Sequence, residues 1–307
     1  MIRFPILVAG PAYFGMFDPL SGRVGVLDAG AGDYYGISWS EREIFLLARN
    51  GGRGETIRVF DDLGRLTANV EIGRHIDGHQ ILFHERSLFV TATRENALIR
   101  LNPETGAQSL WNWTEHSTDV NHINGLAPGP DGGLLVSHDN RGGTASEIVT
   151  LSAAGEVTDR IDLGFPELGS HNIEGNHVTA SGQDSVLWQL APDGTKTEVF
   201  RRSGEFFRGL GRCRTTNGQW SWLVGASGVM PRELRGLPQA GWIHQLSGNP
   251  LTLGNTVAIP EIGQIYELRS LDPECSHNGL PCPLKWDSGL EVTDWRPVAE
   301  TKTGSPR

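Results

Sequence analysis

Short apolar segments that end in a glycine turn recur along the whole chain. Within a segment, apolar and polar residues alternate, as in LWQL at 187–190, whereas a helix would need a period of 3.6 residues. The closing glycines lie 39 to 54 residues apart, at Gly22, Gly64, Gly106, Gly155, Gly194 and Gly248. A strand-built repeat of about 40–50 residues is typical of a propeller blade.

A second pattern, strand–polar turn–strand, precedes the first by about 25 residues. It reads YYGISWSEREIFLLARN at 34–50, GHQILFHERSLFVTATREN at 78–96 and NGLAPGPDGGLLVSHDN at 124–140, with further copies at 171–184 and 208–227. Together the two patterns predict blades of four strands. The N-terminus lacks an innermost strand, and the unpaired segment GQIYELRS at 263–270 supplies one.

We therefore predict an all-β fold, a six-bladed β-propeller closed by pairing of the N- and C-terminal strands. Ring closure removes the exposed sheet edges that an open array would leave. The propeller is expected to span residues 1–271 as a single domain. Residues 272–307, which are rich in proline, are expected to form an irregular C-terminal tail.

Composition and charge argue against several classes of binding partner. Glycine makes up 40 of the 307 residues and the formal net charge is −10, opposite in sign to what nonspecific binding to nucleic acid or an anionic membrane needs. No apolar run approaches the ~18 residues of a membrane span. GxGxxG and Walker patterns are absent, so no nucleotide cofactor is expected. Three cysteines and an N-terminus interrupted by prolines favour a cytoplasmic location.

One stretch resembles a known group of propellers. Residues 124–132, NGLAPGPDG, and the LLVSHDN that follows resemble the Asn-Gly-Leu-x-x-x-x-Asp-Gly motif of gluconolactonase, strictosidine-synthase and NHL-repeat propellers. The blade pattern of that superfamily covers about 260 residues here. In metal-dependent gluconolactonases the Asn is a metal ligand, a role that only Asn124 can take in this chain. The Glu-Gly-Pro stretch that supplies another of their ligands is absent.

Six of the ten histidines map to one face of the predicted propeller, at the start of innermost strands or in the loops beside them. On that face the first residues of each innermost strand line the mouth of the central channel. Alignment of the repeats gives one such residue per blade: Tyr35, His79, Asn124, His171, Arg208, and Gly263 or Gln264. His122 lies two residues before Asn124, so it faces the same way along an extended chain.

His79, His122 and His171 come from three successive blades and form a candidate metal site. Imidazole is a common ligand of divalent transition metals, and three protein ligands leave positions open for water or substrate. We expect Fe, Zn, Mn or Cu there. The alternatives are hydrogen-bonded channel residues without a metal, or neutral histidines that act in acid–base catalysis.

Other residues on this face complete the predicted site. Glu174 or Asp139 is expected to act as acid or base, and Tyr35 is a further catalytic candidate. Arg208 is expected to hold a carboxylate through its two-pronged guanidinium, unless it pairs with Glu174 or Glu205. The candidate substrate-binding residues are Arg49, Arg94, Asn124 and His138.

The first prediction of function is a metal-dependent enzyme that acts on a small molecule at the channel mouth. Hydrolase, lyase and oxidoreductase chemistry are all compatible with these residues. A non-catalytic propeller that binds a peptide or protein is one alternative, and a metal-free enzyme that uses histidine as acid and base is another. We also expect the largest polar pocket to lie at the end of the channel that bears these histidines.

Overall fold

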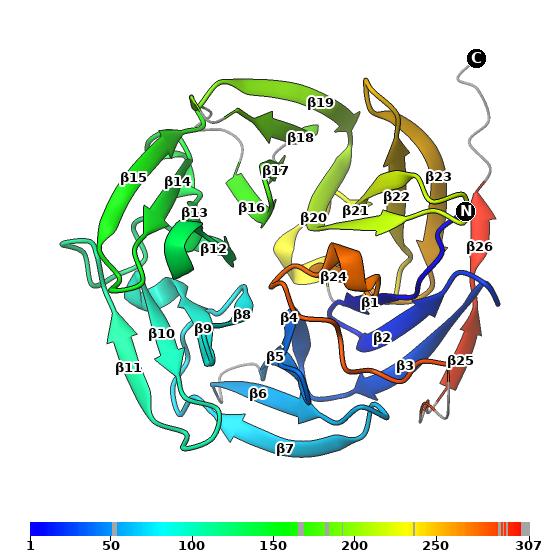
Figure 1. Ribbon diagram of the computed structural model, residues 1–307, viewed down its shortest axis with the longest axis horizontal. Coiled ribbons are helices and arrows are strands. Elements are labelled where there is room, and N and C mark those ends of the chain that lie inside the picture. Colours follow the sequence, from blue (N-terminus) through cyan, green and yellow to red (C-terminus); the bar gives the residue numbers. More distant parts are fainter. Residues whose placement is uncertain are drawn as a thin grey trace.

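The structure is a computed structural model in which six sheets surround a central axis (Figure 1). The residues it describes are 1–50, 54–164, 169–181, 184–191, 193–235, 237–287, 290, 292 and 294–301. Each sheet is antiparallel, and consecutive strands run outward from the axis. The predicted all-β, six-bladed propeller is therefore confirmed.

Blades two to four each contain four strands. Their bounds, from the innermost strand outward, are β4 (Asp33–Trp39), β5 (Ile44–Arg49), β6 (Glu55–Phe60) and β7 (Leu66–Glu71); β8 (Ile81–His84), β9 (Ser87–Ala92), β10 (Ala97–Leu101) and β11 (Gln108–Trp111); β12 (Ile123–Pro128), β13 (Leu134–His138), β14 (Glu147–Leu151) and β15 (Val157–Asp162).

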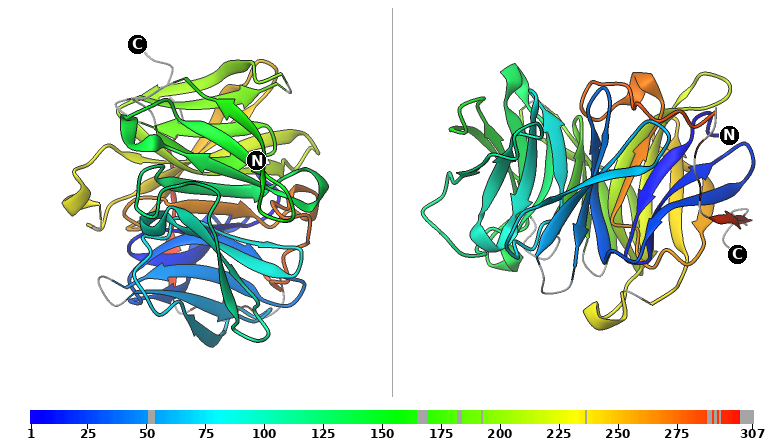
Figure 2. Two further views of the ribbon diagram at one scale, coloured as in Figure 1. Left: turned by 90° about the vertical axis from the view of Figure 1, so that its left-hand side faces the viewer. Right: turned by 90° about the horizontal axis from the view of Figure 1, so that it is seen from below.

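Blades five and six follow the same order. They comprise β16 (Gly169–Glu174), β17 (His177–Ser181), β18 (Asp184–Leu190) and β19 (Lys196–Ser203); β20 (Glu205–Arg214), β21 (Trp220–Gly228), β22 (Gly241–Ser247) and β23 (Thr252–Ile259). The connection between β21 and β22 carries the short 3-10 helix η4 (Arg232–Leu234), which projects from one face of the ring (Figure 2). A second 3-10 helix, η5 (Pro273–Cys275), lies on the other face.

Blade one joins the two ends of the chain. Its innermost strand is β24 (Glu267–Ser270), which pairs with β1 (Ile6–Ala9), followed by β2 (Tyr13–Asp18) and β3 (Arg23–Ala29). The β1–β24 pairing is antiparallel, with Ile6 opposite Ser270 and Ala9 opposite Glu267. The closure predicted from residues 263–270 is thus confirmed.

The C-terminal region, expected to be irregular, adds two short strands. β25 (Asp294–Pro297) extends blade one by pairing with β3, and β26 (Ala299–Thr301) extends blade six by pairing with β23. The two strands therefore cover the outer edges of blades one and six, edges that would otherwise be open to further pairing. Earlier in the tail, the Leu280 carbonyl accepts a hydrogen bond from Trp39 Nε1 of blade two at 2.7 Å.

Apolar side chains fill the spaces between neighbouring blades. The cluster between blades one and two, for example, contains Phe14, Tyr34, Trp39 and Phe60, all buried. Because the inner strands of each sheet are packed on both faces by neighbouring blades, they are largely buried, whereas the outermost strands β7, β11, β15 and β19 are mostly exposed. No helix in the described part of the chain is long and apolar enough to cross a membrane.

Four innermost strands carry a β-bulge near the start of the strand. The register shifts between Tyr34 and Ile37 in β4, between Ile123 and Gly125 in β12, between Ser170 and Ile173 in β16, and between Phe207 and Leu210 in β20. A bulge re-aims a side chain and is common beside functional sites. These four bulges coincide with the residues that the repeat alignment places at the channel mouth, namely Tyr35, Asn124, His171 and Arg208.

Candidate functional site

A cavity of about 240 Å³ lies at the channel mouth. The residues that line it come from strands β4, β5 and β20 and from four connections between strands: Asp33, Tyr35, Arg49, His79, His122, Arg208, Arg235 and Tyr266. Five of these were predicted from the sequence, so the repeat alignment brought most of the site together correctly. We refer to this space as the mouth cavity.

A larger cavity, of about 830 Å³, lies between blades two and three on the opposite face. The β4–β5 and β8–β9 turns form its walls together with Asn278 and Leu280 from the tail, and His84 is part of its lining. The mouth cavity is thus the smaller of the two, and its lining is the more polar, since Phe45, Phe83 and Leu280 contribute to the larger one. His84 lines the larger cavity from the end of β8, and Asn278 anchors the tail there by donating to the Trp39 carbonyl at 2.6 Å.

His79 and His171 are buried beside the mouth cavity. Neither ring has a hydrogen-bond partner for either nitrogen among the described residues, and the nearest carboxylate oxygen to His79 Nε2 is that of Asp77 at 3.9 Å. Burial, followed by the positive charge of Arg208, holds the pKa of each histidine well below its ordinary value of about 6.5. Both imidazoles are therefore neutral at neutral pH.

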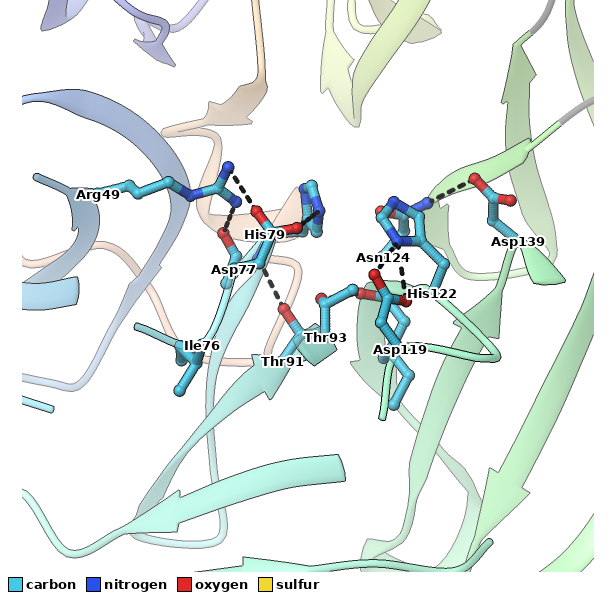
Figure 3. A network of polar contacts seen from close by, with 12 residues as sticks. Arg49, Ile76, Asp77, His79, Thr91, Thr93, Asp119, His122, Asn124 and Asp139 are labelled. Atoms are coloured by element: carbon cyan, nitrogen blue, oxygen red, sulfur yellow. Dashed lines mark hydrogen bonds and ion pairs between the residues drawn. The ribbon is translucent and has the colours of Figure 1, made fainter. Parts of the chain in front are cut away.

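His122 faces His79 across the mouth cavity, with the two ring centroids 5.2 Å apart (Figure 3). Its Nδ1 lies 3.1 Å from Oδ1 of Asp119, and Oδ2 of the same carboxylate accepts a hydrogen bond from Arg141. A carboxylate at Nδ1 fixes the orientation and the tautomer of an imidazole. His122 thus differs from His79 and His171 in having a carboxylate partner.

Asn124 and Asp139 form a pair next to His122. Asn124 Nδ2 donates to Asp139 Oδ2 at 3.3 Å (Figure 3). The other oxygen of Asp139 accepts the Arg141 backbone N–H at 2.8 Å. Neither residue lines the mouth cavity. Their contacts instead hold the loop after β13 against the segment that carries His122.

Arg49 is neutralised by its neighbours. Its Nη1 lies 2.7 Å from Asp77 and its Nη2 donates to the Gly78 carbonyl at 2.8 Å. The guanidinium also stacks 4.1 Å above the ring of Tyr35, which in turn stacks on Tyr266 with the ring centroids 4.5 Å apart. The positive charge of Arg49 is therefore compensated by Asp77, and its guanidinium is held against the two stacked tyrosine rings.

Arg208 has no such compensation. Its side chain makes no hydrogen bond or ion pair with any described residue, although only 8% of the residue is exposed. The guanidinium lies over the rings of Tyr266 and Phe206, at 5.3 Å and 5.5 Å. The pairing with Glu174 or Glu205 considered from the sequence does not occur, because Glu205 bonds His244 and Arg202 while Glu174 lies near Arg212 and Arg269.

A layer of polar side chains closes the axis beneath the mouth cavity. The buried carboxylate of Glu267 accepts hydrogen bonds from Gln80, from Asn172 Nδ2 at 3.2 Å and from Arg269 Nη2 at 3.2 Å. These side chains come from alternate blades, and we call them the axial layer. Gln80, Asn172 and Glu267 directly follow the mouth residues His79, His171 and Tyr266.

The three remaining blades have glycine at the position of the axial layer: Gly36, Gly125 and Gly209. A Cβ on Gly36 would lie 2.5 Å from Gln80 Oε1, and one on Gly125 would lie 2.4 Å from the His171 carbonyl. At Gly36 and Gly125 a side chain would therefore collide with the side chain or backbone contributed by the next blade, so this layer is filled from alternate blades.

The other predicted site residues lie away from the mouth cavity. Glu174 is buried on the far side of the axial layer, where burial raises its pKa to about 7. His138 bonds Glu147 at 2.9 Å inside blade four, and Arg94 is exposed. The sequence placed them on the correct blades but not at the correct depth.

Asp33, Arg235 and Tyr266 were missed. Asp33 precedes Tyr35 by two residues, the same relation that led us to His122 from Asn124, so this signal was present. Tyr266 replaces Gly263 or Gln264 as the mouth residue of blade one, because β24 begins only at Glu267. Arg235 lies in the β21–β22 connection, which has no counterpart in the repeat.

The predicted three-histidine metal site is not reproduced as a ligand cluster. In the described ranges, no three His, Cys, Asp or Glu side chains are arranged so that they could hold a metal ion. The guanidinium groups of Arg208 and Arg235, which form no ion pair with a described residue, also line the mouth cavity, and their positive charge opposes the binding of a divalent cation.

Comparisons with known proteins extend only to the fold. No protein-family model and no curated protein matches the chain. A solved structure from a nidogen–laminin complex is 11% identical with a TM-score of 0.63, covering 87% of this chain and 98% of that one. A candidate 6-phosphogluconolactonase from Bacteroides uniformis is 11% identical with a TM-score of 0.53, covering 97% and 99%.

A virginiamycin B lyase from Staphylococcus aureus is 12% identical with a TM-score of 0.48, covering 79% of this chain and 96% of that one. At such identities a shared fold does not transfer an activity. The nidogen–laminin and Bacteroides likenesses therefore show the fold alone. The chain is a six-bladed β-propeller.

Proposed function

We propose that the protein is a small-molecule enzyme that transfers a proton in the mouth cavity without a metal. The observation that carries the proposal is the His122–Asp119 pair on the cavity wall, 5.2 Å from the neutral His79 ring. One imidazole supported by a carboxylate and others held neutral are the two kinds of histidine that acid–base chemistry uses.

His122 is the proposed base. It would accept a proton from a carbon or oxygen of the substrate, and the imidazolium that forms would be stabilised by the Asp119 carboxylate. A neutral imidazole carries one N–H donor and one acceptor nitrogen. His79, which lines the cavity, can therefore donate to a substrate oxygen on which negative charge develops.

Solvent exchange tests this proposal without knowledge of the product. The protein is incubated in D₂O with a panel of small aldehydes, ketones, lactones, amines and carboxylic acids, and deuterium incorporation is followed by NMR. We expect incorporation into one class of compound, with a loss of about 10²–10⁴-fold in His122→Gln, the range for removal of an acid–base group.

The matched control is His116→Gln, which alters an exposed histidine in the same connection. This variant should exchange at the wild-type rate. Wild-type exchange no faster than that of His122→Gln across the panel contradicts the proposal.

The His-ligated metal remains a second candidate. It is favoured by the four imidazole nitrogens of His79 and His171, which are buried and have no partner among the described residues. Ligation would satisfy one nitrogen on each ring. Protein purified without a His-tag should then contain stoichiometric Fe, Zn, Mn or Cu, and His171→Ala should lose it while His84→Ala keeps it.

Protein that contains no metal and binds none of these ions on titration removes the second candidate and leaves the first untouched. If proton exchange also fails, the remaining prediction is a non-catalytic propeller that binds a peptide or protein.

A further inference from the structure

The least satisfied charge in the mouth cavity is the guanidinium of Arg208. A buried charge without a partner is strongly unfavourable, so proteins pair such groups or use them to bind a ligand. Arg208 is more than nine-tenths buried, lines the cavity, and has a buried Nε without a hydrogen-bond partner among the described residues.

Two acidic groups near Arg208 are engaged elsewhere. Glu267 is held in the axial layer by Gln80, Asn172 and Arg269. Asp77 pairs with Arg49 at 2.7 Å. Asp33 is the acid among the described residues that line the cavity, and no ion pair joins it to Arg208; burial raises the pKa of its carboxyl, and the charge of Arg49 opposes that rise.

A second guanidinium strengthens the positive charge of this wall. Arg235 lines the same cavity and lies 5.3 Å from the Phe206 ring, the ring over which Arg208 also lies. It forms no ion pair with a described residue, and its Nε donates to the Met230 carbonyl at 3.4 Å. The two arginines thus share one wall without an acidic partner.

We infer that the mouth cavity binds a small molecule through an oxyanion, a carboxylate or a phosphate, held by Arg208 with Arg235 beside it. A guanidinium presents paired N–H donors that match either group. The inference rests on the function proposed above, because it names the class of substrate for that site. The volume of about 240 Å³ is below the ~300–1,000 Å³ of pockets that take drug-sized ligands, so the molecule is small.

The position of the oxyanion sets where chemistry occurs on the molecule. Arg208, His79 and His122 all line the same cavity of about 240 Å³, so the guanidinium and the two imidazoles face one small space. The carbon or oxygen that loses a proton to His122 is therefore a near neighbour of the anionic group, within the same small ligand.

Calorimetric titration with acetate, malonate and inorganic phosphate tests the inference. We expect saturable binding of the carboxylates or of phosphate, and the arm that saturates identifies the source. Arg208→Met should weaken that binding at least tenfold. Arg208→Lys, which keeps the charge but loses the paired donors, should weaken it by less.

Arg202→Gln is the matched control, since Arg202 is an exposed arginine at the end of β19 whose partner is Glu205. It should bind the anion as the wild type does. If Arg208→Met does not fold, Arg208→Lys and Arg235→Met still decide the matter, because each should weaken binding relative to Arg202→Gln.

Two outcomes overturn the inference: none of the three anions saturates the protein, or the binding persists unchanged in Arg208→Lys and Arg235→Met. The proposed function fails separately. Anion binding that depends on Arg208, combined with no deuterium exchange, would retain the oxyanion site and remove the enzyme. Deuterium exchange confined to uncharged compounds would instead retain the proposed enzyme and remove the oxyanion site.

Discussion

Two buried arginines on the propeller axis differ in what surrounds them. Arg269, in the axial layer, is 2% exposed, and its guanidinium reaches the carboxylates of Glu267 at 3.2 Å and Glu174 at 3.6 Å. It also donates to the Leu210 carbonyl at 3.2 Å. Arg208, one layer above, is 8% exposed and has none of these contacts with described residues.

The difference separates structure from function. A buried cation surrounded by carboxylates and carbonyls holds strands from several blades together, and its removal leaves charges unpaired. A buried cation that has only aromatic neighbours contributes little to folding and stays available to a ligand. We therefore assign the axial layer to stability and the mouth cavity to binding.

The largest predicted effect is the loss of the ring. Deleting residues 260–275 removes β24, and with it Glu267 and Arg269, and exposes strand edges in blade one. We expect no cooperative thermal transition by circular dichroism. Ending the chain after residue 293 removes β25 and β26 but leaves the ring closed, so that truncation should still unfold cooperatively. A cooperative transition in the 260–275 deletion would show that closure is dispensable.

Replacing Arg269 should cause the next largest loss of stability. Arg269→Met leaves the carboxylates of Glu267 and Glu174 buried near each other without their shared cation. Breaking a buried pair in this way typically lowers the free energy of unfolding by about 3–5 kcal/mol. Urea denaturation measures the change. A loss below about 1 kcal/mol, the worth of a surface pair, would mean that the axial layer is not structural.

The pH dependence of stability should report Glu174. Its folded-state pKa of about 7 exceeds the ordinary value of 4.5, chiefly because of burial. The folded state therefore holds this proton between pH 4.5 and 7 while the unfolded state releases it, so stability falls as the pH rises through that window. The loss attributable to this group is on the order of 3 kcal/mol.

Glu174→Gln should remove this slope. The difference in unfolding free energy between wild type and variant should change between pH 4.5 and 7 and stay constant above. A difference that is flat across the window would show that Glu174 ionises in the fold as it does in water.

The repeat pattern gives the blades and the mouth residues because each blade reproduces the same strand at the same place. This is why Tyr35, His79 and Arg208 could be aligned from the sequence. Depth along the axis was harder to predict. Glu174 follows His171 by three residues, and a strand rises ~3.3 Å per residue, so Glu174 lies beyond the axial layer.

Contacts between distant segments leave no periodic signal. Gln80, Asn172 and Glu267 meet only because three alternate blades converge on the axis. The partner of His122, Asp119, lies in a connection outside the repeat, as does Arg235. These residues could be found only once the ring was closed.

The most direct measurement is the free energy of unfolding of Arg208→Met, determined by urea denaturation beside wild type in a buffer free of carboxylate and phosphate. The account predicts no loss, or a gain of up to about 1–4 kcal/mol, since replacing an uncompensated buried charge with an apolar side chain of similar volume is neutral or stabilising. A loss of about 3 kcal/mol or more, comparable with that expected for Arg269→Met, would show that Arg208 is a paired structural residue and would contradict the assignment of the mouth cavity to ligand binding.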